Sequence, residues 1–165
     1  MKRLAVLSVV FVLLAGAAAA QDDREPPSSV FKQGSMRQVG KLGTYCWSWQ
    51  DDMGSGGGKC VDTIGAAWPR IKQAVRGTRA RITIRYPELP DDASLTYWRR
   101  VDKDQQPVGE GTSLEFTSTS RSTDNGTVWD LRFEVPDYRG RMYLWGFFAW
   151  ELKGDASYYW RLSLI

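Results

Sequence analysis

A strict alternation of apolar and polar side chains, beginning at residue 79, is the feature that most limits how this chain can fold. Over residues 79–86 every second side chain is apolar, and the same two-residue period returns over residues 127–135. This period is typical of a β-strand that buries one face and exposes the other to water. It does not match the spacing of an amphipathic helix, so the pattern predicts sheet structure in this half of the chain.

Four further segments have the apolar content and the flanking turn residues of strands. They are residues 95–101, a short strand with Leu114 and Phe116, residues 142–152 and residues 157–165. Six strands at this spacing, with no helical segment alternating with them, predict an all-β sandwich. Residues 66–77 leave two interpretations open. Trp68, Ile71 and Val75 have helical spacing, but an extended segment that supplies a seventh strand fits them equally well.

Residues 1–20 have the three parts of an export signal. Lys2 and Arg3 form the basic start, an uncharged apolar run follows, and small residues lead up to Ala20. We expect cleavage after Ala20, with an uncleaved membrane anchor as the alternative. Loss of Lys2 and Arg3 lowers the net charge from +3 to +1. We therefore expect a secreted or cell-envelope protein that binds neither nucleic acid nor, after cleavage, a membrane.

The chain has two cysteines, Cys46 and Cys60, and no histidine. Export places the cysteines in an oxidising compartment, where a disulfide is the default for such a pair. Closing a loop of this length stabilises a fold by roughly 3 kcal/mol. A metal or redox role lacks the C-x-x-C spacing and the histidine ligands. Asp51, Asp52 and Asp62 do not form the Asp-x-Asp-x-Asp-Gly pattern of a calcium loop, so no metal or cofactor is predicted.

These features divide the chain into four parts. They are a signal peptide at 1–20, a flexible leader at 21–34, a disulfide-containing N-terminal region at 35–76 and a β-sandwich at 77–165. The leader is assigned from its charged, proline-containing composition, which offers little apolar surface to bury.

Two motifs resemble those of known proteins. Residues 45–47 and 60–62, which read Tyr-Cys-Trp and Cys-Val-Asp, resemble a disulfide motif of small exported proteins of Gram-positive and actinobacterial type. Residues 137–145 resemble the corner before the penultimate strand of bacterial immunoglobulin-like domains, where a tyrosine hydroxyl bonds back to the backbone. The resemblance implies an immunoglobulin-like antiparallel β-sandwich of about seven strands with an N-terminal disulfide-closed loop. It assigns Tyr143 to the structural corner and Trp145 to the core position of the usual second cysteine.

The aromatic side chains suggest a candidate binding face. With Tyr143 at the corner, alternation points Trp145, Phe147 and Ala149 into the core and their neighbours outward. The outward aromatic and arginine side chains then form a face made of Trp98, Arg100, Phe148, Trp150, Tyr159 and Arg161. Such side chains are enriched at binding hot spots, and large exposed apolar patches are unusual. The alternative is that the N-terminal region, or the segment around Trp68, simply covers this face.

Arginine and lysine are in excess over residues 70–100. Arg81 and Arg85 point outward from their strand, and we expect them to pair with Asp130 and Glu134 on an adjacent strand. A stripe paired in this way would be structural and would not bind polyanions strongly.

No catalytic residue is predicted, because the chain lacks Gly-x-Ser-x-Gly, His-Glu-x-x-His and phosphate-loop motifs. We expect an exported, non-catalytic binding or structural module whose partner is a cell-surface glycan or protein. One alternative is a secreted inhibitor of a protease or other hydrolase, acting through loop 47–59 or 118–126. A weaker alternative is a polysaccharide-acting enzyme that uses two carboxylates.

Overall fold

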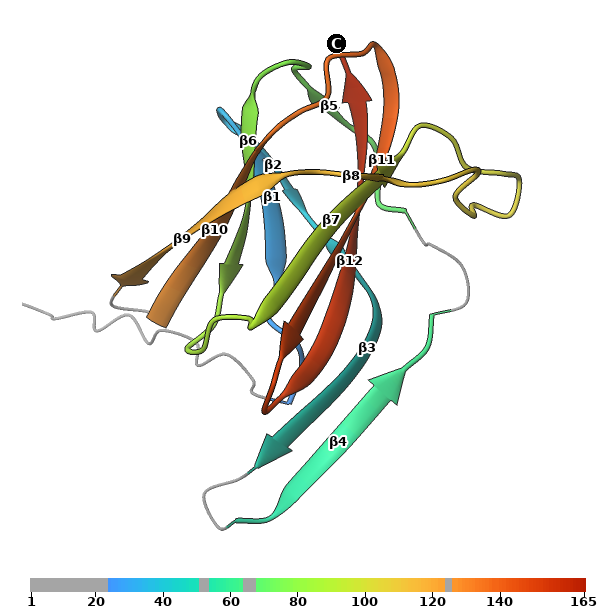
Figure 1. Cartoon of the computed structure of the whole chain (residues 1–165). Helices are drawn as coiled ribbons and strands as arrows, with labels where there is room; N and C mark the ends of the chain where they lie inside the picture. The colour runs from blue at the N-terminus through green and yellow to red at the C-terminus, as the bar shows by residue number, and fades with distance from the viewer. Residues whose placement is uncertain (1–23, 51–53, 64–67, 124–125) are drawn as a thin grey trace, which may run out of the picture.

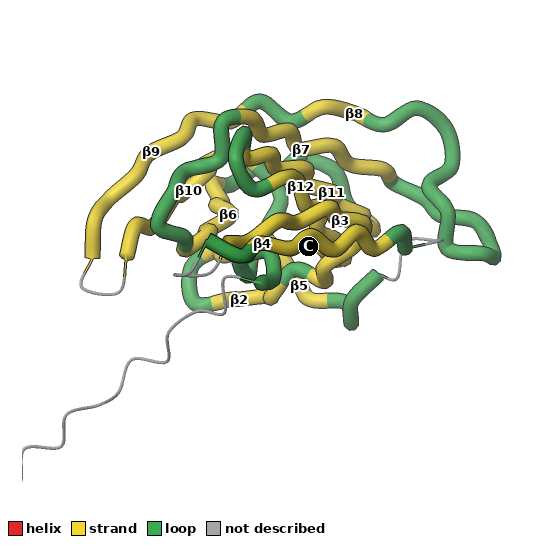
Figure 2. Tube along the Cα trace, turned by 90° about the horizontal axis from the view of Figure 1, so that it is seen from below, coloured by secondary structure: helices red, strands yellow, loops and turns green. Residues whose placement is uncertain are grey.

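The computed structural model describes residues 24–50, 54–63, 68–123 and 126–165. Throughout these ranges the chain is strand and loop, without a helix (Figures 1 and 2). The strands form two sheets, which confirms the predicted all-β, sandwich-like class. Twelve strands are present in the described residues, more than the seven expected. The predicted signal peptide at 1–20 lies outside the described residues.

The smaller sheet, sheet A, has five antiparallel strands. In spatial order they are β2 (Met36–Val39), β1 (Ser29–Gln33), β6 (Arg79–Arg85), β10 (Gly126–Glu134) and β9 (Phe116–Thr123). The two strands with the clearest alternation, β6 and β10, are neighbours inside this sheet, as the sequence predicts.

The larger sheet, sheet B, has seven strands. In spatial order they are β4 (Gly56–Val61), β3 (Lys41–Gln50), β12 (Gly154–Leu164), β11 (Gly140–Trp150), β7 (Asp92–Trp98) and β8 (Thr112–Ser113), with β5 (Lys72–Ala74) also paired to β12. β5 runs parallel to β12, and it resolves the ambiguous segment before residue 79 as extended rather than helical. The β3–β4 hairpin projects beyond the rest of sheet B at the lower right of Figure 1.

The core lies between the two sheets, where the inward side chains of both meet. Ile82 and Leu131 point into it from sheet A, while Leu144 and Trp160 point into it from sheet B, and all four are fully buried. Burying each such side chain contributes about 1.5–3 kcal/mol. Much of the tryptophan content therefore serves the core.

At two positions in sheet B, neighbouring atoms lie so close to the backbone that only glycine fits. Gly154 has a φ of 116°, and a Cβ there would lie 2.0 Å from the carbonyl oxygen of Cys46 on β3. Gly146 faces the core, where a Cβ would lie 3.0 Å from the ring of Phe148 and 3.1 Å from that of Trp160. Glycine alone lets these rings and strands approach so closely. Gly146 also interrupts the row of large apolar side chains on the core side of β11.

The structure describes residues 24–34 of the predicted flexible leader, and part of this segment packs against the sheets. Pro26 and Pro27 are buried, and the Tyr158 hydroxyl donates a hydrogen bond to the carbonyl oxygen of Pro27. Phe31, on the interior strand β1, is fully buried in the core. The polar composition of the segment concealed this anchor, because a single phenylalanine and one backbone carbonyl are enough to fix it.

The predicted N-terminal region at 35–76 supplies strands to both sheets. It contributes β2 to sheet A and β3, β4 and β5 to sheet B. The predicted boundary at residue 77 lies in the loop between β5 and β6 and does not separate the sheets. The disulfide accordingly sits within sheet B, in mid-chain.

Strand β9 extends through Thr123, into the 118–126 segment that the inhibitor alternative takes as a loop. Its side chains are mostly exposed, and its single neighbour is β10. An exposed edge strand needs no apolar alternation, so its sequence of serines and threonines carries no strand signal.

Candidate binding face

The outward surface of sheet B is rich in aromatic side chains. On β11, Tyr143, Trp145 and Phe147 point away from the core, because the residues that alternate with them are buried in it. The register brings residues of β7 and β12 with the same orientation beside them. We call this surface the aromatic face, and it consists of Trp98, Tyr143, Trp145, Phe147, Tyr159 and Arg161.

The structure turns only part of the predicted set of side chains toward this surface. Three of the predicted side chains lie on it: Trp98, Tyr159 and Arg161. Phe148 and Trp150, at 0% and 2% exposed, are in the core instead, where Trp150 packs edge-on against Trp47. Arg100 is exposed, but it lies beyond Trp98, the last residue of β7.

The prediction placed Phe148 and Trp150 outward because it exchanged the inward and outward faces of β11. Taking Tyr143 as a core residue placed Trp145 and Phe147 inward, and a shift of one residue exchanges the two faces of a strand. Trp145 therefore does not occupy the core position of an immunoglobulin second cysteine. Large apolar side chains occupy both faces of β11, and Gly146 interrupts the true core face, so neither face stands out in the sequence.

The turn before β11 does contain a tyrosine that bonds to the backbone, but it is Tyr138 rather than Tyr143, and its partner lies three residues downstream instead of upstream. Its hydroxyl donates to the carbonyl oxygen of Arg141 at 2.9 Å. Its ring stacks on that of Tyr97, with the centroids 6.1 Å apart. Burial raises the pKa of Tyr138 to about 12, so the hydroxyl remains a donor at neutral pH.

Trp68 covers the end of the aromatic face at which Tyr143 lies. Its ring meets those of Tyr143 and Tyr159 edge-on, with the centroids 5.1 Å apart in both pairs. Its indole N–H donates to the carbonyl oxygen of Gln105 at 2.9 Å, which ties the covering segment to the loop after β7. Tyr143 is only 2% exposed as a result. The sequence left open whether the segment around Trp68 covers the face. In the structure, this segment covers this end of it.

The other end of the aromatic face is partly exposed. There the rings of Trp145 and Phe147 stack, with their centroids 6.0 Å apart and their planes at 27°. Thr96 and Ser94, opposite these two residues on β7, add hydroxyl groups. Burial raises the pKa of Tyr159, which therefore stays neutral beside Trp145. This end offers flat rings surrounded by uncharged polar groups.

Two carboxylates complete this end of the face. Asp92 on β7 and Asp155 on β12 lie opposite Ala149 of β11, one on each side. They follow Phe147 along the same outward surface. The open end thus combines an aromatic platform, hydroxyl groups and carboxylates, and sequence reasoning missed this combination because it depends on the phase of β11.

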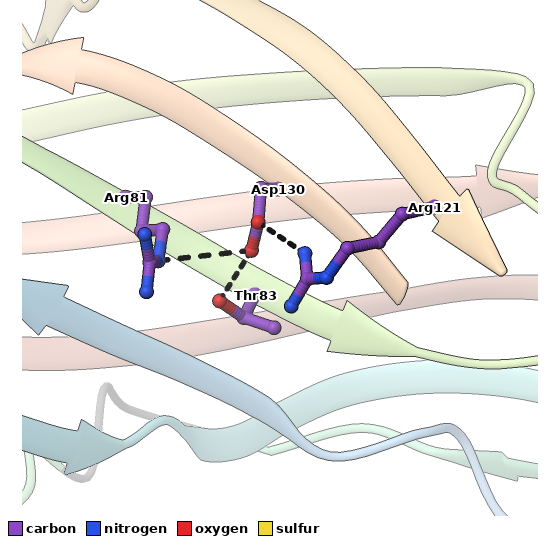
Figure 3. Close-up of polar contacts among 4 residues, drawn as sticks. All are labelled: Arg81, Thr83, Arg121 and Asp130. Atoms are coloured by element: carbon purple, nitrogen blue, oxygen red, sulfur yellow. Dashed lines mark hydrogen bonds and ion pairs between the residues drawn. The ribbon is translucent and has the colours of Figure 1, made fainter. Parts of the chain in front are cut away.

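The outer face of sheet A is organised around one buried carboxylate, Asp130, which is 2% exposed. It accepts hydrogen bonds from the Thr83 hydroxyl at 2.7 Å and from Arg121 Nη1 at 2.6 Å, and Arg81 Nε lies 3.8 Å away (Figure 3). Burial alone would raise the pKa of Asp130. The two hydrogen bonds and the two guanidinium charges outweigh it and hold the pKa below its ordinary value.

The pairing predicted for the basic stripe is correct only for Arg81, which approaches Asp130. Arg85 and Glu134 lie toward opposite ends of the β6–β10 pair, and the register sets Glu134 opposite Arg79. In the described part of the chain, neither Arg85 nor Glu134 takes part in an ion pair. The stripe is therefore less neutralised than the sequence suggested.

The predicted disulfide between Cys46 and Cys60 is present. It joins residues directly opposite each other on β3 and β4, with their Cα atoms 4.0 Å apart. It closes a hairpin within sheet B instead of linking the two sheets. A disulfide indicates an extracellular or otherwise oxidising environment.

The two loops of the inhibitor alternative are largely strand. Residues 47–59 span the ends of β3 and β4, and residues 118–126 span the ends of β9 and β10, apart from positions outside the described residues. Across the described ranges, no three His, Cys, Asp or Glu residues gather closely enough to hold a metal ion. Asp51 and Asp52 of the calcium alternative lie outside those ranges. Within them, no helix has the length and hydropathy to span a membrane.

No protein family, curated protein or solved structure matches this chain. Its function is therefore argued from the chemistry of its two outward faces.

Proposed function

We propose that this protein is an exported, immunoglobulin-like, non-catalytic binding module that holds a glycan on the open end of its aromatic face. The two-sheet, largely antiparallel architecture supports the immunoglobulin-like assignment. The disulfide supports export.

The stacked rings of Trp145 and Phe147 carry the proposal. They project from β11, which has neighbours on both sides in sheet B, so their position is fixed by the sheet. The face of an aromatic ring is electron-rich and flat, and the C–H groups on one side of a sugar ring can pack against it. Two such rings in line offer a platform for consecutive sugar units.

The polar groups around the platform suit hydroxyl-rich ligands. Ser94 and Thr96 can donate and accept hydrogen bonds, while Asp92 and Asp155 accept them. A sugar presents hydroxyl groups at its edge and C–H groups on its face, so both kinds of group find a partner here. A protein hot spot would favour a larger, fully apolar centre. Trp68 already covers the other, more apolar end of this face.

The test is affinity electrophoresis of the mature, oxidised chain in gels that contain neutral soluble polysaccharides such as β-glucan, xylan and mannan. We expect at least one polysaccharide to retard the wild type. Trp145→Ala and Phe147→Ala should each weaken this binding by about tenfold or more, the loss expected when a central aromatic contact is removed. The control is Trp49→Ala, which removes a half-buried tryptophan from the hairpin outside the aromatic face.

Three results would contradict the proposal. The first is migration unaffected by every polysaccharide, and the second is equal retardation of the wild type and Trp145→Ala. The third is release of reducing sugar from the retained polysaccharide. That result would assign Asp92 and Asp155 the role of the two carboxylates of a hydrolase. Inhibition of a protease or hydrolase that survives Trp145→Ala would favour the inhibitor alternative.

A further inference from the structure

Four cationic side chains stand in line across the outer face of sheet A. The register sets Arg37 opposite Lys32, Lys32 opposite Arg81, and Arg81 opposite Arg132. Neighbouring strands of a sheet lie about 4.8 Å apart, so the four Cα atoms span roughly 14 Å across β2, β1, β6 and β10. Thr117 of β9 continues the line, and none of these positions holds an acidic residue.

This arrangement costs the fold stability, because like charges directly opposite each other on neighbouring strands repel. Lys32 shows the effect: burial, followed by the charges of Arg37 and Arg81, lowers its pKa. The nearby carboxylate, Asp130, is already engaged in its own buried cluster. Among the described residues, Lys32, Arg37 and Arg132 form no ion pair. The fold thus maintains a line of four positive charges in which only Arg81, among the described residues, approaches a carboxylate.

We infer that this line binds a linear anionic polysaccharide, one that carries carboxylate, sulfate or phosphate groups along its length. Arg85 and Arg121 project from the same surface beside it, and we call the line with these two residues the basic face. An extended chain laid across the strands would meet one cation on each of four successive strands. Guanidinium groups bind such oxyanions through paired hydrogen bonds as well as charge.

Other polyanions suit the basic face less well. Its described outward residues are arginine, lysine, threonine, valine and acidic side chains, so it offers no aromatic ring on which the bases of a single-stranded nucleic acid could stack. An anionic membrane would be held more firmly if apolar side chains entered its interface. Only Val39, at the edge of the sheet and 63% exposed, is placed to do so.

The inference is independent of the aromatic face, which lies on the other sheet, and it is tested on the mature, oxidised chain. Heparin serves as the linear anionic polysaccharide, and dextran of similar length as the uncharged control. Isothermal titration at several salt concentrations measures the dissociation constant. We expect binding to heparin and none to dextran, with an affinity that falls as salt rises.

Two double variants show whether heparin binds to the line of cations itself or responds only to the net charge of the protein. Lys32→Gln with Arg132→Gln should weaken heparin binding by about tenfold and flatten its salt dependence, because two contacts are lost. Lys72→Gln with Arg139→Gln removes the same charge from exposed positions elsewhere and should leave the affinity within about twofold. Urea unfolding of both variants shows that the fold is intact, and Trp145→Ala should bind heparin as the wild type does.

Several outcomes would overturn the inference. Absence of heparin binding at physiological salt is one, and an equal loss in both double variants is another. Tighter binding to a DNA oligonucleotide, or to vesicles that contain phosphatidylglycerol, would assign the basic face to a nucleic acid or a membrane instead. Heparin binding that is lost in Trp145→Ala would move the site to the aromatic face.

Discussion

Sheet A turns arginine and lysine toward solvent, whereas sheet B turns tryptophan, tyrosine and phenylalanine outward. Both sheets bury an apolar side in the common core, so the chemistry of their outer sides is what separates them. In sheet A, the contrast between Ile82 and Arg81 tells which side faces the core. In sheet B, Phe147 and Phe148 are chemically identical. Only the neighbouring strands determine which of the two side chains faces the core. A strand's inward face can be read from sequence only when its two faces differ in polarity.

Truncating the two adjacent phenylalanines of β11 one at a time tests most directly which face of this strand is buried. Phe148→Ala should lower the free energy of unfolding by about 3–5 kcal/mol, since it leaves a cavity beside Tyr158 and Trp129. Phe147→Ala, on the outward face, should cost less than about 1 kcal/mol. Urea denaturation measures both, and losses of equal size would show that the strand faces are wrongly assigned.

Asp130 offers the corresponding test in sheet A. Asp130→Asn should cost about 1–3 kcal/mol at neutral pH, because the charge-assisted bond from Arg121 is lost. The folded state lowers the pKa of Asp130 below the unfolded value of 3.8. Its stabilising charge is therefore fully present above that value, and its contribution is lost as the pH falls through the folded pKa. Urea midpoints of the wild type and Asp130→Asn should converge at acid pH, and a constant gap from pH 7 to pH 2 would exclude this role.

The smallest effect concerns the turn that leads into β11. Tyr138→Phe keeps the ring stacked on Tyr97 but removes the bond to the Arg141 carbonyl, at a cost of about 0.5–1.5 kcal/mol. Tyr143→Phe should change stability less, because no hydrogen bond in the described residues involves the Tyr143 hydroxyl. Thermal unfolding of the two variants compares them directly. A larger loss in Tyr143→Phe would restore the corner to that residue.

The sequence was sufficient for the sheet class, the disulfide and the strands whose two faces differ. It was insufficient for β1, where Phe31 and the bond from Tyr158 anchor a largely polar segment, and for the polar part of β9 that follows Phe116. β1 pairs with β6, a strand distant in the chain, and local composition carries no record of such a partner. β9 pairs with the next strand, β10, but its exposed side chains leave no apolar alternation to read.

The two candidate sites were predictable to different degrees. Trp98, Tyr159 and Arg161 could be placed because their strands have one clearly apolar face. The cover provided by Trp68 depends on a loop contact with Gln105 that no periodicity encodes. The line through Lys32 and Arg132 likewise exists only after the strand register is known. A glycine within an apolar run, such as Gly146, is the signal that could have indicated the true core side of β11.

The last strand in chain order, β12, occupies an interior position in sheet B, where it pairs with β3, β11 and β5. Without β12, the β3–β4 pair would be separate from β11, β7 and β8, and β5 would lose its partner in the sheet. Pairing across such sequence distances is slow and leaves edges open to association with other chains. Completion of the aromatic face, which takes Tyr159 and Arg161 from β12, therefore depends on β12 joining these parts of sheet B.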